Sequence, residues 1–428
     1  MRILFLYFSL VLSLLFSVTV YSQDIRLEIG EEEPVPHWIT LPFLFHTESL
    51  DTAYGLAGGT SGYFQPQMST FGAIMDTTND SRGLFISIKD YQFQSLPRLF
   101  ATFTGSIGDW TDQRSYAGFN PDYPKERGGS NESSDDNYIT GKGRNNWFDL
   151  SFRYLLPTGD GRDTLINTFF LDRGIIESGE LNTSEWNPST SGRLYFETML
   201  FSHQRNFDQN PGEIAGDTNG LSLALEYDNR NFPVDPSKGS FQRFTINRDF
   251  GMFDSTSSWT NLDLDLRKYL SLAETKWFRQ RVLALNAWTS YTPSWEKSVT
   301  HNGPVIDHRP PNSKGASLGG FERLRAYPMH RFSDKAALLY SAEMRLTTQW
   351  NPHRWQLLRS LDVDWVQVVP FAEIGRVADS WSASELHKDM KWDLGIGFRF
   401  MMHKAVFRAE FATSEDSWSS WMMVGQPF

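Results

Sequence analysis

The chain lacks cysteine altogether, with none in 428 residues. This absence excludes disulfides, thiolate metal sites, a cysteine nucleophile and a lipidated N-terminal cysteine. Positive charge is also scarce, because 40 Lys and Arg oppose 51 Asp and Glu and leave a net charge of −11. A protein that binds nucleic acid needs clustered cations to neutralise phosphates, so no nucleic-acid partner is expected.

Long apolar runs are equally rare. The only run of membrane-spanning length covers residues 3–20 and follows Arg2. It is typical of a signal peptide, residues 1–22, cleaved near Ser22/Gln23, and an uncleaved anchor helix is the alternative. No later stretch has the roughly 18 apolar residues that a transmembrane helix requires. The sequence predicts a short acidic periplasmic linker over residues 23–37.

Alternation with a period of two fills the remainder of the chain. Residues 221–228, 259–270 and 392–402 each place apolar side chains on one face and polar side chains on the other, as strands do. The predicted lipid-facing residues are Leu221, Leu223, Leu225, Leu262, Leu264, Leu266, Leu394, Ile396 and Phe398.

These strands favour a membrane barrel over a soluble β-sandwich. They are about ten residues long, the length that a tilted strand needs to cross a bilayer. Their polar faces carry charges of both signs, as a water-filled lumen does. We therefore expect an all-β fold, a single transmembrane antiparallel β-barrel of about 16 strands over residues 38–428.

The number of strands should be even, and the longer connections between strands should lie on one side of the membrane. The alternating stretches number 17, whereas single-chain bacterial barrels have an even number, and residues 165–202 are the suspect region. The longer connections are expected on the outer face, and the turn at residues 231–239 on the periplasmic side. The outer-face connections are residues 108–144, 173–192, 205–219, 292–335 and 378–389.

Motifs for catalysis are missing. The sequence has no G-x-S-x-G elbow, phosphate loop or dinucleotide fingerprint, and its nine histidines are scattered. We expect no catalytic residue, no cofactor and no metal site, although a Ser/His site assembled from distant strands would make a lipid-acting enzyme possible. Residues 133–138, SSDDNY, suit either calcium or, more simply, a solvated loop.

The most informative segment is SLGGFERLRAYPMHRFSDKAALLYSAEMRL, residues 317–346. It resembles the sixth extracellular loop of the BamA/TamA-type outer-membrane barrel superfamily, the bacterial surface antigen family. The resemblance covers L-G-G, the L-R-A-Y of Leu324, Arg325, Ala326 and Tyr327, then R-F and E-x-R. The family has glycine where this chain has Ala326.

Other stretches agree with the resemblance in the same order along the chain. Residues 225–241 are similar to the family's Y-D-x-R-x-x-P hairpin, and residues 370–380 to its F-x-D/E-x-G strand, here Phe371, Glu373 and Gly375. Residues 39–59 resemble the opening hairpin, and residues 408–428 the last two strands, which end at Phe428.

The resemblance implies how the site is built. It inserts the long loop into the lumen, with the latch motif (Leu324, Arg325, Ala326, Tyr327) against the lumen motif (Phe371, Glu373, Gly375). Alternation also points Glu373 into the lumen, where Phe371 offers a ring to a guanidinium. Glu343 and Arg345 are expected as supporting lumen charges.

The same resemblance sets the functional expectations. The interval before residue 38 holds no periplasmic docking (POTRA) domain, so a barrel-only member is expected. It would assist insertion or translocation of protein or lipid at a lateral seam. Pro427 either weakens the terminal strand or belongs to a frayed end that has no role. A passive pore is the alternative. Outer-membrane lipid, and a periplasmic or lipoprotein partner encoded separately, are the expected partners.

Overall fold

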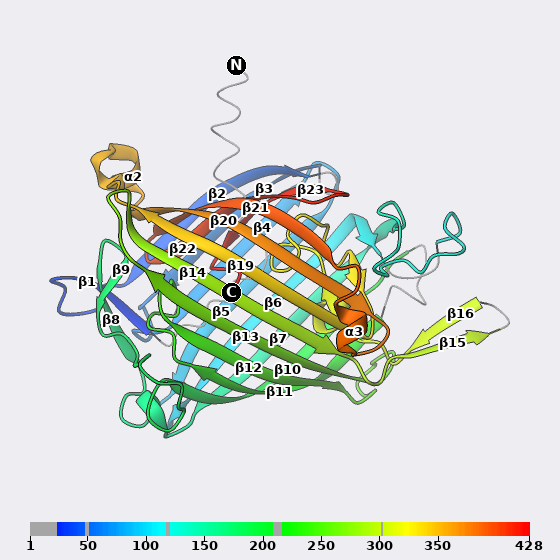
Figure 1. Cartoon of the computed structure of the whole chain (residues 1–428), viewed down its shortest axis with the longest axis horizontal. Helices are drawn as coiled ribbons and strands as arrows, with labels where there is room; N and C mark the ends of the chain where they lie inside the picture. The colour runs from blue at the N-terminus through cyan, green and yellow to red at the C-terminus, as the bar shows by residue number, and fades with distance from the viewer. Residues whose placement is uncertain (1–23, 48–50, 117–119, 209–215, 301–302) are drawn as a thin grey trace, which may run out of the picture.

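The computed structural model describes residues 24–47, 51–116, 120–208, 216–300 and 303–428, without the side chains of residues 41, 44–47, 298–300 and 303–306. The predicted cleavage near Ser22/Gln23 lies outside these residues. Within them, 16 strands form one sheet rolled into a barrel, which confirms the predicted fold (Figure 1). Its strands are β2 (His37–Thr47), β3 (Asp51–Ser61), β4 (Ser69–Thr77), β5 (Arg82–Phe93), β6 (Leu96–Ser115), β7 (Ile139–Leu155), β10 (Arg193–Arg205), β11 (Gly216–Asp228), β12 (Gly239–Asp249), β13 (Trp259–Leu272), β14 (Phe278–Tyr291), β19 (Ala336–Thr348), β20 (Val363–Ala378), β21 (Lys391–Met402), β22 (Ala405–Thr413) and β23 (Trp418–Val424).

Each strand pairs antiparallel with the next strand of the sheet, so inward and outward side chains alternate. On β11, Leu225 is 50% exposed whereas its neighbour Glu226 is fully buried. On β21, Leu394 is 51% exposed beside the buried Asp393. The predicted lipid-facing residues therefore lie on the outer wall, and the charged residues between them line the lumen.

The suspect region explains the surplus strand. β8 (Asn167–Asp172) and β9 (Ile175–Ser178) belong to a separate three-stranded sheet in which β8 pairs parallel with β1 (Asp24–Glu28). The predicted linker over residues 23–37 thus contains a strand. Further short pairs are β15 (Glu296–Thr300) with β16 (Gly303–Asp307), and β17 (Ser317–Leu318) with β18 (Phe332–Ser333).

Because the strand number is even, the sheet begins and ends at one end of the barrel, here named the terminal end; the opposite end is the loop end. The prediction that residues 173–192 lie at the outer face was wrong, because β7 and β10 join at the terminal end through residues 156–192. The expected position of the turn at residues 231–239 agrees with the structure. The α-helices among the described residues are short: α2 (Gln356–Ser360) and α3 (Ala383–Leu386). No helix within the described ranges is long and apolar enough to span a membrane.

The terminal end of the lumen is filled. Phe169 and Leu171 from β8 pack with Phe232 from the turn between β11 and β12 and with Trp365 of β20 in one buried cluster. The backbone carbonyl of Gly174 accepts a hydrogen bond from Trp365 Nε1 at 3.2 Å. The long connection therefore crosses the barrel mouth and docks on the opposite wall.

The loop end is filled by two connections. The β15–β16 hairpin projects from the barrel (Figure 1), but residues 312–335 fold back into the lumen. Arg331 donates to Ser133 Oγ at 2.9 Å and to its carbonyl at 2.5 Å, so the SSDDNY run is a contact between loops. Ser133 is buried in this contact, whereas the two carboxylates of the run, Asp135 and Asp136, are exposed, as in the solvated loop that the sequence suggested.

The seam between the first and last strands is not joined. Among the described residues no ladder connects β2 with β23, although both contribute to the lining of one cavity, through Trp38 and Ile39 on β2 and Val424 on β23. β23 has 7 residues and β2 has 11. The chain then turns at Gly425, whose φ of 92° suits glycine, and leaves the wall.

The outer and inner faces of the wall at β12 and β13 give a test of the barrel. We expect Leu264→Arg to cost about 2–4 kcal/mol of unfolding free energy, because it places a charge near the bilayer midplane. Thr245→Arg should be tolerated, since Thr245 points into the lumen opposite Asp263. Urea unfolding in lipid vesicles measures both variants, and equal losses would contradict the assigned faces.

Candidate functional site: a buried arginine in the lumen

Tight backbone turns shape the loop segment that enters the lumen. Gly319 and Gly320 have φ of 104° and 112°, and a Cβ on either would come within 2.3 Å of Pro328 O or Met329 Sδ, respectively. The Gly320 amide donates to the Tyr327 carbonyl at 3.0 Å. The L-G-G motif therefore makes a compact loop that presents Arg325 at its tip.

Arg325 is fully buried, and carboxylates from three strands surround its guanidinium. Its Nε lies 3.2 Å from Glu373 Oε2 on β20, and its backbone amide donates to the same oxygen at 2.8 Å. Its Nη1 donates at 2.9 Å to both Glu343 on β19 and Glu410 on β22. Burial disfavours the charge, but Glu373, Glu410 and Glu343 outweigh it and raise the pKa of Arg325 well above its ordinary value.

An aromatic ring completes the pocket for the guanidinium. Arg325 Cζ lies 3.5 Å from the centre of the Phe371 ring. Gly395 on β21 makes room for that ring, because a Cβ there would lie 2.1 Å from Phe371 Cζ. Gly375 is equally confined, since a Cβ there would lie 2.9 Å from Leu338 O and 3.0 Å from Leu318 Cδ1. Glycine at these two positions lets the loop and ring approach the wall.

The other latch residues also contact the wall. The Ala326 amide donates to Asp393 Oδ2 at 2.9 Å, and the φ of Ala326 is negative, so alanine causes no strain where the family has glycine. Tyr327 Oη donates to the Trp392 carbonyl at 3.4 Å. Burial raises the pKa of Tyr327 to about 12, which keeps this donor protonated. Leu324, with a φ of 51°, is buried in the cluster beneath the loop.

The network of buried charges includes residues that the sequence analysis did not predict. Glu343 also accepts from Arg345 at 2.9 Å and from Arg399 at 2.6 Å. Glu410 accepts from Arg399 at 2.8 Å and from Arg408 at 2.6 Å. The buried network therefore holds four arginines (Arg325, Arg345, Arg399, Arg408) and four acids (Glu343, Glu373, Glu410, Asp393).

Sequence reasoning missed half of this network. Asp393 and Arg399 lie on the polar face of an alternating stretch, which was a usable signal for inward position. Glu410 and Arg408 follow the same alternation in the strand after it. Their partners could not be read from the sequence, because they belong to strands and a loop far apart along the chain.

The last strand and the C-terminus join the same site. The Arg325 carbonyl accepts hydrogen bonds from Ser419 Oγ and from Trp421 Nε1, both on β23. Arg345 donates to the Phe428 carbonyl at 2.8 Å. Phe428 itself is buried against Tyr269, at the end of the tail that turns inward. The loop tip and the chain terminus are thus held by neighbouring charges.

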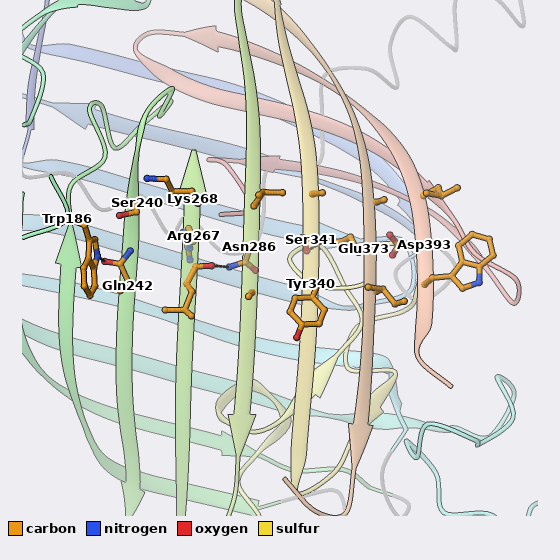
Figure 2. Close-up of a pocket in the computed structure, with 18 residues that line it drawn as sticks. Trp186, Ser240, Gln242, Arg267, Lys268, Asn286, Tyr340, Ser341, Glu373 and Asp393 are labelled. Carbon is orange, nitrogen blue, oxygen red and sulfur yellow. Dashed lines mark hydrogen bonds between the residues drawn. The ribbon is translucent and has the colours of Figure 1, made fainter. Parts of the chain in front are cut away.

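Figure 2 shows the wall in which this network sits. Ser341 and Glu373 come from adjacent strands, with Asp393 on the next strand, whereas the Tyr340 ring projects from the other side. The outer side has a hollow of roughly 930 Å³ over β13, β14, β19, β20 and β21, and the small side chains of Ala287, Ala342 and Ala372 contribute to its lining. The wall is therefore thin directly behind the buried carboxylates.

The arrangement is suited to holding a loop rather than to bond chemistry. Each carboxylate of Glu343, Glu373 and Glu410 contacts at least one arginine.

A different group in the described part of the chain has the composition of a metal site, namely His353, Asp362 and Asp364 at the terminal end. The scattered histidines of the sequence gave no sign of it.

The 16-stranded barrel and the loop arginine buried against lumen carboxylates define the class: an outer-membrane β-barrel whose long loop is fixed in the lumen. The model of the Omp85 superfamily domain matches residues 112–417, and the chain belongs to the Omp85 superfamily. The resemblance to BamA/TamA-type barrels is thereby confirmed, and membership places the protein in the outer membrane.

Two solved structures are similar to this chain. CdiB from Escherichia coli is 9% identical, with a TM-score of 0.54, over 92% of this chain and 63% of that one, so this chain spans less than two thirds of CdiB. BamA from Haemophilus ducreyi, in a structure lacking POTRA domains 1–3, is 12% identical with a TM-score of 0.49, over 92% of this chain and 71% of that one. The likeness to CdiB shows a shared fold. No curated protein sequence matches the chain.

Arg325 gives a direct test of the loop attachment. Arg325→Ala should lower the unfolding free energy by about 3–5 kcal/mol, because it leaves buried carboxylates without their partner. It should also expose residues 292–335 to protease added to intact cells. Lys297→Ala is the control in the same loop, because Lys297 is 36% exposed in its pair with Asp334 and should cost about 0–1 kcal/mol. Equal protease resistance of wild type and Arg325→Ala would disprove the role of this residue.

Proposed function

We propose that the protein assists insertion or translocation of protein or lipid into the outer membrane at the seam between β2 and β23. The observation that carries the proposal is the missing ladder between these strands in the described residues. An unpaired strand edge presents free N–H and C=O groups, to which an incoming strand can add. In lipid such groups are costly, so the edge favours a partner.

The C-terminal tail supports the same proposal. The Gly425 amide donates to the Val406 carbonyl at 2.7 Å, and the chain then turns to bury Phe428 in the lumen. The residues after Val424 therefore do not extend β23 along β2. Pro427 has no N–H and could not donate to a ladder even if the tail returned to the wall. The terminal half of the seam is thereby kept available to a client or to lipid.

A passive pore, the alternative function, has less support. Loop residues 317–335 occupy the lumen from the loop end, and the turn at residues 229–238 is largely buried at the terminal end. A lipid-acting enzyme has the least support, because the buried carboxylates are engaged by arginines. We propose outer-membrane lipid and a separately encoded periplasmic or lipoprotein partner as the interacting molecules.

Locking the seam tests the proposal, and the absence of native cysteine makes the test clean. In Trp38→Cys/Val424→Cys, a short bifunctional thiol reagent should bridge β2 and β23. The bridged protein should accelerate folding of a urea-unfolded eight-stranded barrel into phospholipid vesicles at least about tenfold less than the unbridged protein, because the seam edge is no longer free.

The control shares one position with the test. Phe407→Cys/Val424→Cys bridges β22 and β23, which already pair at these residues, and should leave the acceleration intact. Equal activity of both bridged proteins would argue against a function at the seam.

A further inference from the structure

Three segments meet at the terminal end of the barrel, close to the seam. They are the connection that contains η4 (Pro352–Arg354), the beginning of β20, and the turn between β21 and β22. His403 and Lys404 of that turn help line the cavity that Trp38 and Val424 also line. The three segments bring histidines and aspartates together from positions far apart in the sequence.

The ligand atoms of His353, Asp362 and Asp364 all lie within 4.8 Å of one another. A fourth donor is adjacent, because His403 Nδ1 lies 3.7 Å from Asp362 Oδ2. His353 Nε2 and His403 Nδ1 are both buried and make no hydrogen bond within the described part of the chain. Two buried imidazole nitrogens without hydrogen bonds, beside two carboxylates, are available to a shared ligand.

Local backbone geometry holds these donors in place. Asp362 and His403 have φ of 49° and 48°, a left-handed conformation that aspartate and histidine adopt more readily than most residues. The His403 amide donates to the Asp362 carbonyl at 3.4 Å. The His353 amide donates to Asn351 Oδ1 at 3.0 Å, which fixes the start of η4.

The charge of the group also favours a cation. The ammonium of Lys404 contacts the carboxylate of Glu28 and lies 3.0 Å from Asp364 Oδ2, while Asp362 lies beside His403. Even with Arg26, whose guanidinium donates to the Lys404 carbonyl, two cations face three anions. This excess of negative charge attracts a cation.

We propose that His353, Asp362, Asp364 and His403 bind one divalent transition-metal ion of the zinc class. Neutral imidazole nitrogens and carboxylate oxygens are ligands that Zn²⁺ accepts in tetrahedral sites. Calcium and magnesium prefer all-oxygen sites, so the two imidazoles select against them. The metal joins the connection between β19 and β20 to the β21–β22 turn, beside the terminal end of the seam.

The test uses the full chain, refolded in detergent and stripped with a chelator. Titration with zinc chloride, followed by calorimetry, should show one saturable ion per chain. The double variant His353→Ala/His403→Ala should weaken zinc binding by at least about tenfold, the scale of losses seen even for outer-shell partners of metal ligands. His387→Ala, an exposed histidine at the loop end, should bind zinc as the wild type does.

A second variant separates binding from folding. Asp362→Asn keeps the side-chain shape, and a heat-modifiability gel verifies that each barrel is folded before titration. The proposal is overturned if the folded wild type binds no zinc saturably, if calcium binds as tightly as zinc, or if folded His353→Ala/His403→Ala and Asp362→Asn both bind zinc with wild-type affinity.

Discussion

The lumen has to neutralise Arg325, and much of the barrel is arranged around that requirement. A buried guanidinium without carboxylate partners would be strongly destabilising. Glu343, Glu373 and Glu410 supply the compensation from three strands of the wall. Placing the guanidinium against these carboxylates also requires the Phe371 ring beside it and the space left by Gly375 and Gly395. The loop backbone must turn tightly enough to reach the wall. The loop is therefore fixed by charge complementarity as well as by apolar packing.

The same charges extend to the end of the chain. β23 donates two hydrogen bonds to the Arg325 carbonyl, and Arg345, which shares Glu343, donates to the Phe428 carbonyl. The loop tip, the last strand and the inward tail are consequently parts of one network. A tail held in the lumen cannot extend β23 along β2, so the network that fills the barrel interior also keeps the terminal half of the seam without a ladder in the described residues. This connection between a filled lumen and an open edge is the physical basis of the proposed function.

Much of the fold could be predicted because a lipid-facing wall imposes strict alternation. The faces of β11, β13 and β21 followed from their sequences, and Glu373 was assigned to the lumen for the same reason. The side of residues 173–192 could not be predicted, because the surplus strand β8 alternates like a barrel strand yet pairs with β1. Pairing is a long-range property that local pattern does not encode.

In the candidate site, too, local motifs could be read from the sequence, whereas contacts between distant segments could not. A recurring loop motif indicated Arg325 and Glu373, but the second and third carboxylates come from strands that the motif does not mention. The group around His353 was entirely hidden, since its members are separated by up to 50 residues and meet only where three segments fold together. Both the arginine network and the group around His353 depend on contacts between segments far apart in the sequence.

A double-mutant cycle between Arg325 and Glu410 tests the central claim most directly. Arg325→Met, Glu410→Gln and the double variant would be compared with the wild type by urea unfolding in vesicles. If the loop tip and the last hairpin share one buried network, the coupling free energy should be about 1.5–3 kcal/mol. Effects that add to within about 0.5 kcal/mol would show that the two residues act independently and would contradict the account.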